Sequence, residues 1–343
     1  MIATTGFFDG VHTGHRLVIE RLVSLACERG DESLVVTFWP HPRAVLQDGA
    51  RELRLLTTLE EKKGLLKSLG VDRIEVLDFS RAFASLTAEQ YLRDILRDRF
   101  GVTTLLVGYD NRLGSDRLTA PALAPVAASL GIELIEIEEF GGGGHPETVV
   151  SDDPSQGKPW APRRAGIRGP RKSADFWGGS AEGGHRFPDV HPLQNSISST
   201  RIRKALQEGR IEEATEMLGY GYSLTGVVVA GNRMGRTIGF PTANLRPYEP
   251  LKLIPARGVY VVEAEVLGKR YRGMTDIGTR PTVGGTFPTI ETHILDFDED
   301  IYGLPLTITF LRRLRDEIHF PSLDALRQQL ERDRTACRNS PAG

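Results

Sequence analysis

Two histidines three residues apart are the first side chains in this sequence whose type and spacing could do chemistry. They lie in GFFDGVHTGHRLVIERL (6–22), which predicts a strand end, a tight turn containing glycine and then a helix. His12 and His15 would share one face at the start of that helix, and Gly14 would let the backbone approach a ligand. Free amides at a helix N-terminus and two imidazoles suit a polyphosphate, and could support transfer at the α-phosphate of a nucleotide. The alternative is one histidine that caps the helix and another that faces solvent.

Two further segments carry residues suited to anionic ligands. SISSTRIRKAL (196–206) opens a helix with three hydroxyls and two cations, which predicts a second phosphate clamp or, alternatively, a well-capped surface helix. These residues are Ser198, Ser199, Thr200, Arg201 and Arg203. FWPHPRAVL (38–46) leaves a strand with His41 between Pro40 and Pro42, which predicts a rigid loop at the ligand-binding edge of a sheet.

A separate group of candidate residues lies in GNRMGRTIGFPTANL (231–245). Its glycines and arginines predict a flexible basic loop over nucleotide phosphates, or simply a glycine-rich hairpin, and no GK[ST] makes it a Walker A sequence. They are Gly231, Gly235, Gly239, Arg233 and Arg236. Thr242 and Asn244 follow the rigid Pro241 two residues apart, and their oxygens are ligands acceptable to Mg²⁺.

The segment TIETHILDF (289–297) alternates as a β-strand does. Ile290, Thr292 and Ile294 would share one face, with Glu291, His293 and Leu295 on the other. A carboxylate that projects from such a strand into a barrel mouth could accept a hydroxyl proton during phosphoryl transfer. The alternative is an ordinary glutamate on a surface strand.

Alternating strands and helices must position the first group of residues. The expected strands are 33–39, 72–79, 103–110 and 132–140, and the expected helices between them are 59–70, 88–101 and 120–131. Thr87 is a plausible N-cap, with Gln90 completing a capping box. This alternation predicts a parallel sheet covered by helices on both faces, with ligands at the carboxyl ends of its strands.

The pattern breaks at Gly141. Residues 141–190 hold 11 of the 37 glycines and 6 of the 20 prolines, with four Val or Ile and no Leu. We interpret this stretch as a disordered surface insertion. The alternatives are a regulatory or anion-binding arm, from its basic cluster, and a metal site that uses His145, His185 and His191.

The remainder of the chain reads as a helix followed by a β-domain. We expect a helix over 198–219 and then several antiparallel strands in a small closed barrel or a sandwich. A last helix over 322–334 would have Ser322 as its N-cap and pack Leu323, Leu326 and Leu330 on one side. The domain boundary falls near Gly219 to Tyr222.

Composition excludes several classes of protein. The 343 residues carry 43 Lys and Arg against 45 Asp and Glu, so the net charge is −2, and nothing draws the whole chain to nucleic acid or an anionic membrane. Cys27 and Cys337 form no CxxC pair, which fits a reducing compartment. With no apolar run of membrane length and no secretory pattern at the start, we expect a soluble cytoplasmic protein.

Four motifs of the first half, in order, resemble the nucleotidylyltransferase half of the bifunctional riboflavin kinase/FMN adenylyltransferases, the prokaryotic FAD synthetase family. They are GFFDGVHTGHR, FWPHPRAVL, VGYDNRLG and ISSTRIRKAL. The resemblance implies that FMN phosphate attacks the α-phosphate of MgATP, with catalysis by His12, His15 and Arg201. It also implies ATP or phosphate binding by Gly6, Phe8, Asp9, Gly14, Ser198, Ser199, Thr200 and Arg203, and flavin binding by Pro40, His41, Pro42 and Asp110. Phe7 stands where the family has a polar residue, and Asn111 and Leu113 replace two aromatics.

Motifs of the second half resemble the riboflavin kinase half of the same family. They are GFPTANL, DIGTRPTVGG, ETHILDFDEDIYG and FLRRLRDEIHF. The resemblance implies that Thr242 and Asn244 hold Mg²⁺ and the ATP phosphates and that Glu291 is the base on the ribityl hydroxyl. Gly231, Arg236 and Gly239 would also bind ATP, and Arg315 would lie on the flavin side. Asp276 stands where the family more often has Asn, and Arg280, Pro281 and Thr282 match a motif that we take as structural.

We therefore expect an α/β protein with a Rossmann-like nucleotidylyltransferase domain over 1–219, including the insertion at 141–192. A small antiparallel β-barrel riboflavin kinase domain would follow over 220–338. Riboflavin and ATP would give FMN at the second domain, and FMN and ATP would give FAD and pyrophosphate at the first, both with Mg²⁺. The partners would be these small molecules, with no nucleic acid and no membrane. The alternatives are a flavin-binding or single-activity homologue, and a nucleotidylyltransferase for another phosphate acceptor.

Overall fold

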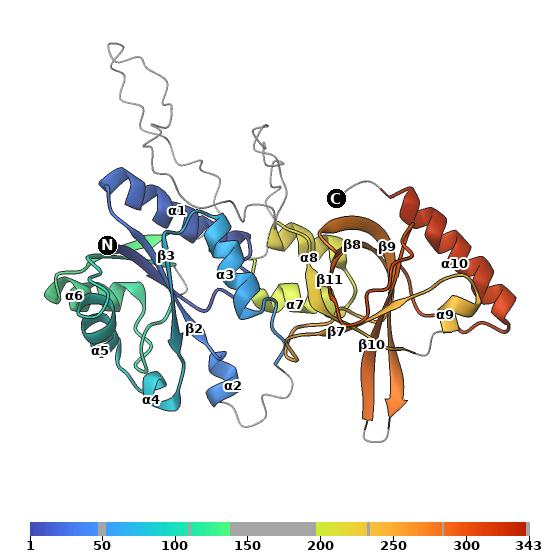
Figure 1. The fold of residues 1–343 in the computed structure, drawn as a ribbon. Helices are drawn as coiled ribbons and strands as arrows, with labels where there is room; N and C mark the ends of the chain where they lie inside the picture. Colours follow the sequence, from blue (N-terminus) through green and yellow to red (C-terminus); the bar gives the residue numbers. More distant parts are fainter. Residues whose placement is uncertain (47–52, 109–110, 138–196, 232–233, 283–284, 341–343) are drawn as a thin grey trace, which may run out of the picture. The chain divides into compact units, whose positions relative to one another are not determined.

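The computed structural model describes residues 1–343 apart from 47–52, 109–110, 138–196, 232–233, 283–284 and 341–343. The predicted insertion, with its three histidines, therefore lies outside the described residues, as do Asp110 and Arg233. Met1–Glu139 and Ile197–Gly343 belong to one compact unit (Figure 1). Among the described helices, none has the length and apolar character needed to cross a membrane.

A five-stranded parallel sheet forms the first half, in the order β3-β2-β1-β4-β5. Its strands are β1 (Ile2–Thr5), β2 (Ser33–Trp39), β3 (Arg73–Asp78), β4 (Thr104–Gly108) and β5 (Glu133–Ile137). The chain adds strands on one side of β1 up to β3 and then on the other side from β4 onward, so the direction of strand order reverses between β1 and β4. β1 pairs in parallel with both of its neighbours, β2 and β4. In open sheets of this kind, ligands bind where the carboxyl ends of the strands diverge at such a reversal. The predicted parallel sheet is confirmed.

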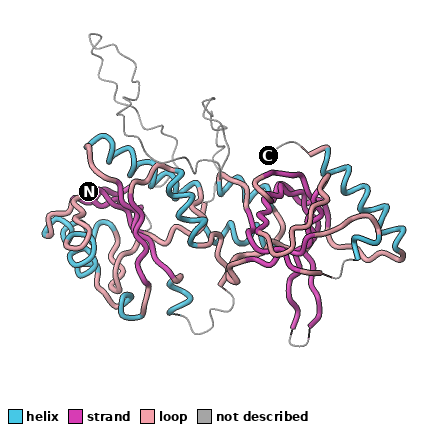
Figure 2. The backbone as a smooth tube through the Cα atoms, viewed as in Figure 1, coloured by secondary structure: helices cyan, strands magenta, loops and turns pink. Residues whose placement is uncertain are grey.

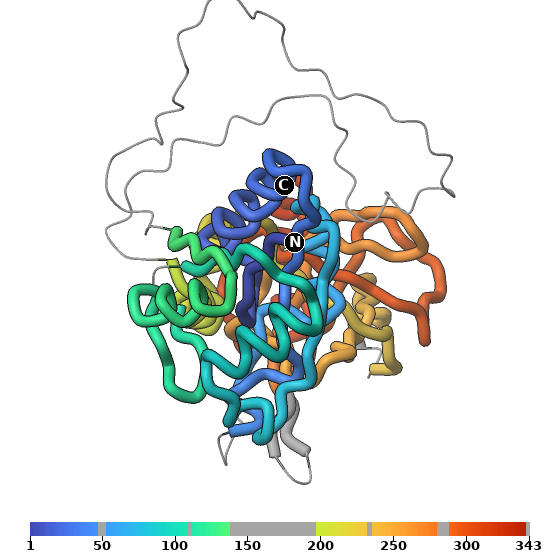
Figure 3. The backbone as a smooth tube through the Cα atoms, turned by 90° about the vertical axis from the view of Figure 1, so that its left-hand side faces the viewer, coloured from blue at the N-terminus to red at the C-terminus, as the bar shows by residue number. Residues whose placement is uncertain are grey.

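Helices cover both faces of this sheet because its strands are apolar on both sides (Figures 1 and 3). Ile2 and Leu106 pack on one face of the sheet, and Ala3 and Leu105 pack on the other. The first face packs against α1 (Thr13–Arg29) and α3 (Leu59–Ser68), and the second against α5 (Ala88–Gln90), the π-helical η2 (Tyr91–Arg97) and α6 (Ala120–Ser129). Two short helices, α2 (Pro42–Leu46) and α4 (Arg81–Ala84), complete this half. Strands that are buried on both faces are typical of parallel sheets.

Local capping sets several of these helix starts. Thr87 and Gln90 form the predicted capping box, and Thr58 forms a second one with Glu61 at the start of α3. The expected continuous helix over 198–219 is wrong, because the chain forms α7 (Ser199–Gln207) and α8 (Ile211–Leu218) instead. Gly209 lies between them at φ +75°, a left-handed conformation that glycine adopts easily and that ends a helix.

The second half is a closed barrel in the strand order β10-β7-β6-β11-β8-β9 (Figure 2). Its strands are β6 (Ser223–Val229), β7 (Ala243–Pro247), β8 (Gly258–Val266), β9 (Lys269–Thr282), β10 (Gly285–Ile294) and β11 (Pro305–Arg315), with the short α9 (Met234–Thr237) after β6. All its strand pairs are antiparallel. The expected barrel, rather than a sandwich, is confirmed.

The core of the barrel extends to the helical pair that precedes it. Ile202 and Leu206 of α7 and Leu218 of α8 lie in one apolar cluster with Tyr260 and Phe310 of the barrel. The helix that carries the second phosphate segment is therefore anchored in barrel side chains. Continuous burial of this kind is the main source of stability for short helices.

The last helix, α10 (Leu323–Arg338), packs on the outer face of the barrel. Ser322 caps it as predicted and Leu330 packs against the apolar cluster of the barrel wall, but Leu323 is 58% exposed, so the predicted packing of Leu323 is wrong. The helix instead buries its C-terminal turns, where Cys337 joins the apolar cluster and Asp333 pairs with Arg315 at 2.8 Å. Leu323 lies in the first turn, before the helix reaches the barrel wall.

Candidate active sites

The loop that follows β1 begins at the carboxyl end of the sheet and leads directly into α1. Phe8 and Val11 have positive φ angles of 51° and 36°, and Gly10 between them has 83°. Left-handed backbone at residues other than glycine costs free energy, and it is concentrated at functional sites. Asn111, from the loop after β4, donates its side-chain amide to the Thr5 carbonyl at 3.3 Å, so the two loops meet at the reversal of strand order.

The two histidines of this loop stack on each other at the start of α1. His12 is the N-cap, and its Nδ1 accepts a hydrogen bond from the His15 backbone amide at 3.4 Å. The ring centroids are 3.6 Å apart with 18° between the planes. A Cβ at Gly14 would lie 3.4 Å from the His12 ring, so this glycine keeps the turn close to the imidazole. The predicted shared face of the two histidines is confirmed, and His12 also caps the helix.

Burial keeps both imidazoles uncharged at neutral pH. It lowers the pKa of His12 from 6.5 to about 4, an effect that the nearby Asp9 carboxylate only partly offsets. Burial also lowers the pKa of His15 well below 6.5, and its stacked partner lowers it further. His15 Nδ1 is buried and has no hydrogen-bond partner. The pair can therefore offer hydrogen bonds to a ligand but no positive charge.

Asp9 is 3% exposed, and its carboxylate is surrounded by donors of the protein itself. It accepts hydrogen bonds from the Leu56 amide at 3.0 Å and from the Thr57 amide at 3.1 Å. Arg203 Nη2 lies 2.5 Å away, and the same guanidinium donates Nε to the Arg54 carbonyl. Asp9 and Arg203 thus bind each other, and their predicted contact with ATP stays a prediction.

This ion pair brings the second phosphate segment to the first loop. Ser199 donates its hydroxyl to the Asp9 carbonyl at 2.9 Å, and Ser198 caps α7 by accepting from the Arg201 amide. Arg201 faces Glu213 of α8 at 3.4 Å, and Thr200 is exposed. The hydroxyls and the N-terminus of α7 therefore lie beside the histidine loop, as the sequence predicts.

A third wall of this site comes from the loop after β2. The His41 ring lies 4.0 Å from the Phe7 ring, centroid to centroid, and its Nδ1 accepts from the Arg43 amide at 3.0 Å. Pro40 and Pro42 flank it, and Pro42 begins α2. Burial lowers the pKa of His41 to about 4. Lys62, which sequence reasoning missed, places its ammonium 4.1 Å from the centroid of the same Phe7 ring.

The remaining glycines and aromatics of the loop pack rather than reach outward. A Cβ at Gly6 would lie 2.9 Å from the Phe8 ring, so the two residues are in close contact. Phe8 is buried and meets the His15 ring edge-on at 5.3 Å. Phe8 thus packs against the histidine pair and Gly6 packs against Phe8, and the predicted role of both toward ATP stays a prediction.

The barrel gathers its candidate residues in one row across neighbouring strands. Glu291 of β10 pairs with Asn244 of β7 on one side and with Asp276 of β9 on the other. Asp276 pairs with Val259 of β8, which pairs with Arg315 of β11. Directly opposed residues share one face of a sheet, so Asn244, Glu291 and Asp276 lie side by side, and Val259 separates Arg315 from them.

Glu291 lies on the outer face of the barrel, toward α10. The neighbouring Ile290 and Ile294 are in the barrel core, whereas Leu295 packs with Cys337 of α10. The expected alternation is confirmed, but the expected direction into the barrel mouth is wrong, because the apolar face of the strand occupies the interior. Thr242 donates its hydroxyl to Glu291 Oε2 at 3.1 Å.

The oxygens of this row suit a hard divalent cation. A threonine hydroxyl, a carboxamide and a carboxylate come together at Thr242, Asn244 and Glu291, and Mg²⁺ prefers such donors with substrate phosphates. A Cβ at Gly231 would lie 2.2 Å from the Asn244 side-chain nitrogen, so only glycine allows this approach. Within the described residues, no three His, Cys, Asp or Glu side chains form a metal-binding group.

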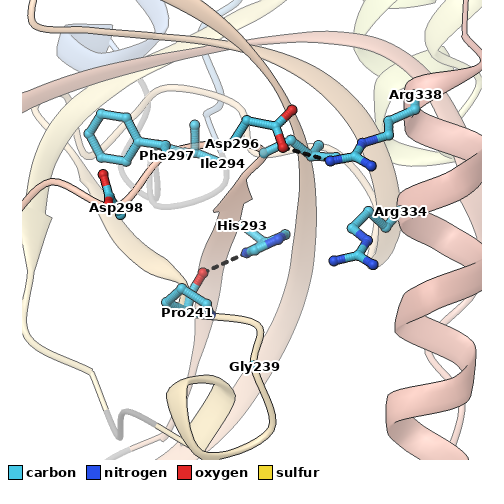
Figure 4. Close-up of a pocket in the computed structure, with 10 residues that line it drawn as sticks. Gly239, Pro241, His293, Ile294, Asp296, Phe297, Asp298, Arg334 and Arg338 are labelled. Carbon is cyan, nitrogen blue, oxygen red and sulfur yellow. Dashed lines mark hydrogen bonds and ion pairs between the residues drawn. The ribbon is translucent and has the colours of Figure 1, made fainter.

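A pocket of about 410 Å³ is lined in part by residues that lie close in sequence to Thr242 and Glu291, although not by those two themselves (Figure 4). Pro241 and His293 line it, and a hydrogen bond of 2.8 Å connects the Pro241 carbonyl oxygen and His293 Nδ1. Arg334 and Arg338 of α10 line the opposite side, and Arg338 pairs with Asp296. Gly239 lies at its edge, and Arg236 is an exposed residue of α9. Arg334 pairs with Glu331, and Asp296 and Asp298 also line the pocket, so carboxylates already balance its two arginines.

Asp276 also belongs to the row, although in the sequence it stands out only as a residue that differs from the asparagine more usual in the family. Burial, with Glu317 and Glu291 nearby, raises the pKa of its carboxyl from 3.8 to about 6. Arg315 opposes that shift, but its guanidinium is already bound by Asp333 through Nε at 3.0 Å. The predicted flavin-side role of Arg315 stays a prediction, and the side chains of 280–282 lie outside the described residues.

Known proteins match both halves. A family model described as FAD synthetase matches residues 1–151, and one described as riboflavin kinase matches 218–340. A bifunctional riboflavin kinase/FMN adenylyltransferase of Listeria monocytogenes is 32% identical over 97% of this chain and 90% of its own length. The Escherichia coli K12 protein of the same name is 33% identical over 98% and 91%. A solved Streptococcus pneumoniae structure, described as a macrolide-efflux protein, matches with a TM-score of 0.79 and 30% identity over 99% of this chain and 94% of its own.

Proposed function

Because this chain belongs to the family of bifunctional riboflavin kinase/FMN adenylyltransferases, we propose that it makes FMN and then FAD at two separate sites. The chain is an enzyme of FAD biosynthesis with ATP as co-substrate. The site after β1 adenylylates FMN, and the row on β7, β10 and β9 phosphorylates riboflavin. We place the boundary between the two halves at Gly219 and Tyr220.

In adenylylation, an FMN phosphate oxygen attacks the α-phosphorus of ATP, and the bond to the β-phosphate bridge breaks as pyrophosphate leaves. The neutral His12 and His15 donate hydrogen bonds to the phosphate oxygens, because burial depresses their pKa values. The N-terminus of α7, with Ser198, Thr200 and Arg201, holds the rest of the phosphate chain. The Phe7–His41 wall faces the flavin side.

In the kinase reaction, the ribityl hydroxyl attacks the γ-phosphorus of ATP, and ADP leaves. Glu291 accepts the hydroxyl proton, and its bond to Thr242 fixes the carboxylate in place. Thr242 and Asn244 would hold Mg²⁺, which neutralises phosphate charge when bound.

One observation carries the two-site proposal: the stacked histidines lie at the start of α1 beside the parallel sheet, whereas the Asn244–Glu291–Asp276 row lies in the barrel. The two free thiols, Cys27 and Cys337, suit a reducing cytoplasm, and the substrates are small molecules.

Chromatography of flavins after incubation with riboflavin, ATP and Mg²⁺ tests the proposal. We expect His12→Ala to make FMN but no FAD, and Glu291→Gln to make FAD only when FMN is supplied. Variants that each impair both reactions equally would refute the two-site assignment. FMN that accumulates in the natural protein without FAD would show a single-activity homologue.

A further inference from the structure

Lys62 of α3 is 1% exposed, and its ammonium group lies directly beneath the histidine loop. Its Nζ donates to the Phe7 carbonyl at 2.9 Å and to the Thr37 hydroxyl at 3.0 Å. The Phe7 ring covers it at 4.1 Å from Nζ to centroid. Among the described residues, its hydrogen-bond partners are one carbonyl and one hydroxyl, neither of which carries a charge.

A buried ammonium without a bound carboxylate is costly, so a fold that retains one needs a reason. Burial lowers the pKa of Lys62 from 10.5 to about 8, and only the Asp9 carboxylate, which is already bound by Arg203, opposes that shift. The other titratable groups that face it are His15 of α1 and His41 of the loop after β2. Lys62 lowers the pKa of both imidazoles.

Among the described residues, the two arginines that α7 brings to the adenylylation site each pair with a carboxylate, Arg203 with Asp9 and Arg201 with Glu213. Both stacked histidines are neutral, and the Arg203 guanidinium is used by Asp9. Negative charge grows on the phosphate oxygens during transfer, and a fixed cation in a site of low dielectric stabilises it strongly. Phe7 separates Lys62 from solvent, which preserves the strength of that interaction.

We propose that Lys62 is a positioning residue of adenylylation: it supplies a positive charge beneath the histidine loop and fixes the Phe7 carbonyl. This inference deepens the proposed function and rests on it. The Lys62 side chain lies under the loop, so it acts through Phe7 and the imidazoles rather than by contact with substrate.

The experiment compares Lys62→Met, Lys62→Arg and a matched control, Lys67→Met, on the exposed side of the same helix. FAD formation from supplied FMN is measured with FMN formation in the same protein as the internal reference. We expect Lys62→Met to lose roughly 100-fold in kcat for FAD, the size of loss that a small misplacement of the site from outside it causes. FMN formation should stay within about twofold, and Lys67→Met should match the natural protein.

The pH profile separates charge from shape. The active form carries a protonated Lys62, so kcat/KM for ATP in FAD formation should fall as the pH rises through about 8. Lys62→Arg stays charged, so its profile should remain flat above that pH, while FMN formation lacks this limb in every variant. If Lys62→Met fails to fold, the profiles of Lys62→Arg and the natural protein still decide the matter.

Titration of the imidazoles by NMR gives a readout that does not depend on turnover. Without the Lys62 charge, the pKa values of His15 and His41 should rise, whereas His12, whose charged neighbours are Asp9 and Arg203, should change less. Unchanged imidazole titrations, or a Lys62→Met protein with natural FAD formation, would overturn the proposal. So would a folded Lys62→Arg that is as inactive as Lys62→Met. A natural protein that makes no FAD would instead refute the proposed function itself.

Discussion

Replacing Asp9 with asparagine should destabilise the whole fold, because Asp9 joins three separate segments. Its carboxylate accepts from the amides of Leu56 and Thr57 and from Arg203, which is 17% exposed. Asparagine has nearly the same volume, but it replaces one acceptor oxygen with a donor that would face these donors. It also leaves the Arg203 guanidinium without its counter-charge.

The expected loss follows from the burial of both partners. Removing one partner of a buried ion pair costs about 3–5 kcal/mol, since the other charge stays desolvated. At about 2–4 °C per kcal/mol for a large domain, the midpoint of thermal unfolding should fall by about 6–20 °C. The matched control is Glu75→Gln, whose partner Arg73 is 39% exposed, and which should cost under about 1 kcal/mol.

Thermal unfolding followed by circular dichroism measures both variants, and flavin chromatography well below the midpoint measures activity. Asp9→Asn should also slow FAD formation, because Asp9 holds the loop that ends at His12, and it should spare FMN formation. An Asp9→Asn midpoint within about 2 °C of the control variant would show that the network around Asp9 does not hold the loop.

Two other predictions concern the barrel, and a third concerns both sites. Thr242→Val removes the hydroxyl that fixes Glu291, so initial rates of FMN formation should fall by roughly 10- to 100-fold with FAD formation from FMN unchanged. Asp276→Asn removes a carboxyl whose pKa is raised from 3.8 to about 6 in the folded protein. Above pH 6 the carboxylate of Asp276 is ionised in the folded state, where burial makes its charge unfavourable, so it destabilises the fold. The variant should be up to about 3 kcal/mol more stable at pH 7 in EDTA, with the gain lost near pH 4, as measured by urea unfolding. Addition of EDTA should stop both reactions, and excess Mg²⁺ should restore them; turnover that persists in EDTA would contradict the assigned Mg²⁺ site.

The sequence predicted those features that depend on short spacing. The shared face of His12 and His15, the capping box at Thr87 and the cap of Ser198 on α7 all follow from residues three apart in the sequence. Glu291 was recognised by its motif, but its direction was not, because which face of a strand turns inward depends on how the barrel closes.

Features that depend on distant partners could not be read from the sequence. Lys62 lies in LEEKKGLLKSLG, where a lysine among polar neighbours looks solvated, and only the packing of α3 under Phe7 buries it. The partner of Asp9 is 194 residues away in the sequence, so its ion pair had no local signal. The break at Gly209 escaped notice because the flanking residues continue the apolar spacing of one helix.

The shared core of α7, α8 and the barrel limits how this protein can be divided. A fragment that ends at Gly219 would keep the Ser198 and Ser199 hydroxyls but expose Ile202, Leu206 and Leu218, whose apolar partners include Tyr260 and Phe310. We expect such a fragment to aggregate when it is expressed alone. A deletion of the part of the chain that forms the barrel would also remove the side chains against which α7 of the first site packs. Loss of the barrel would therefore cost the protein both steps of flavin conversion, not only the phosphorylation of riboflavin.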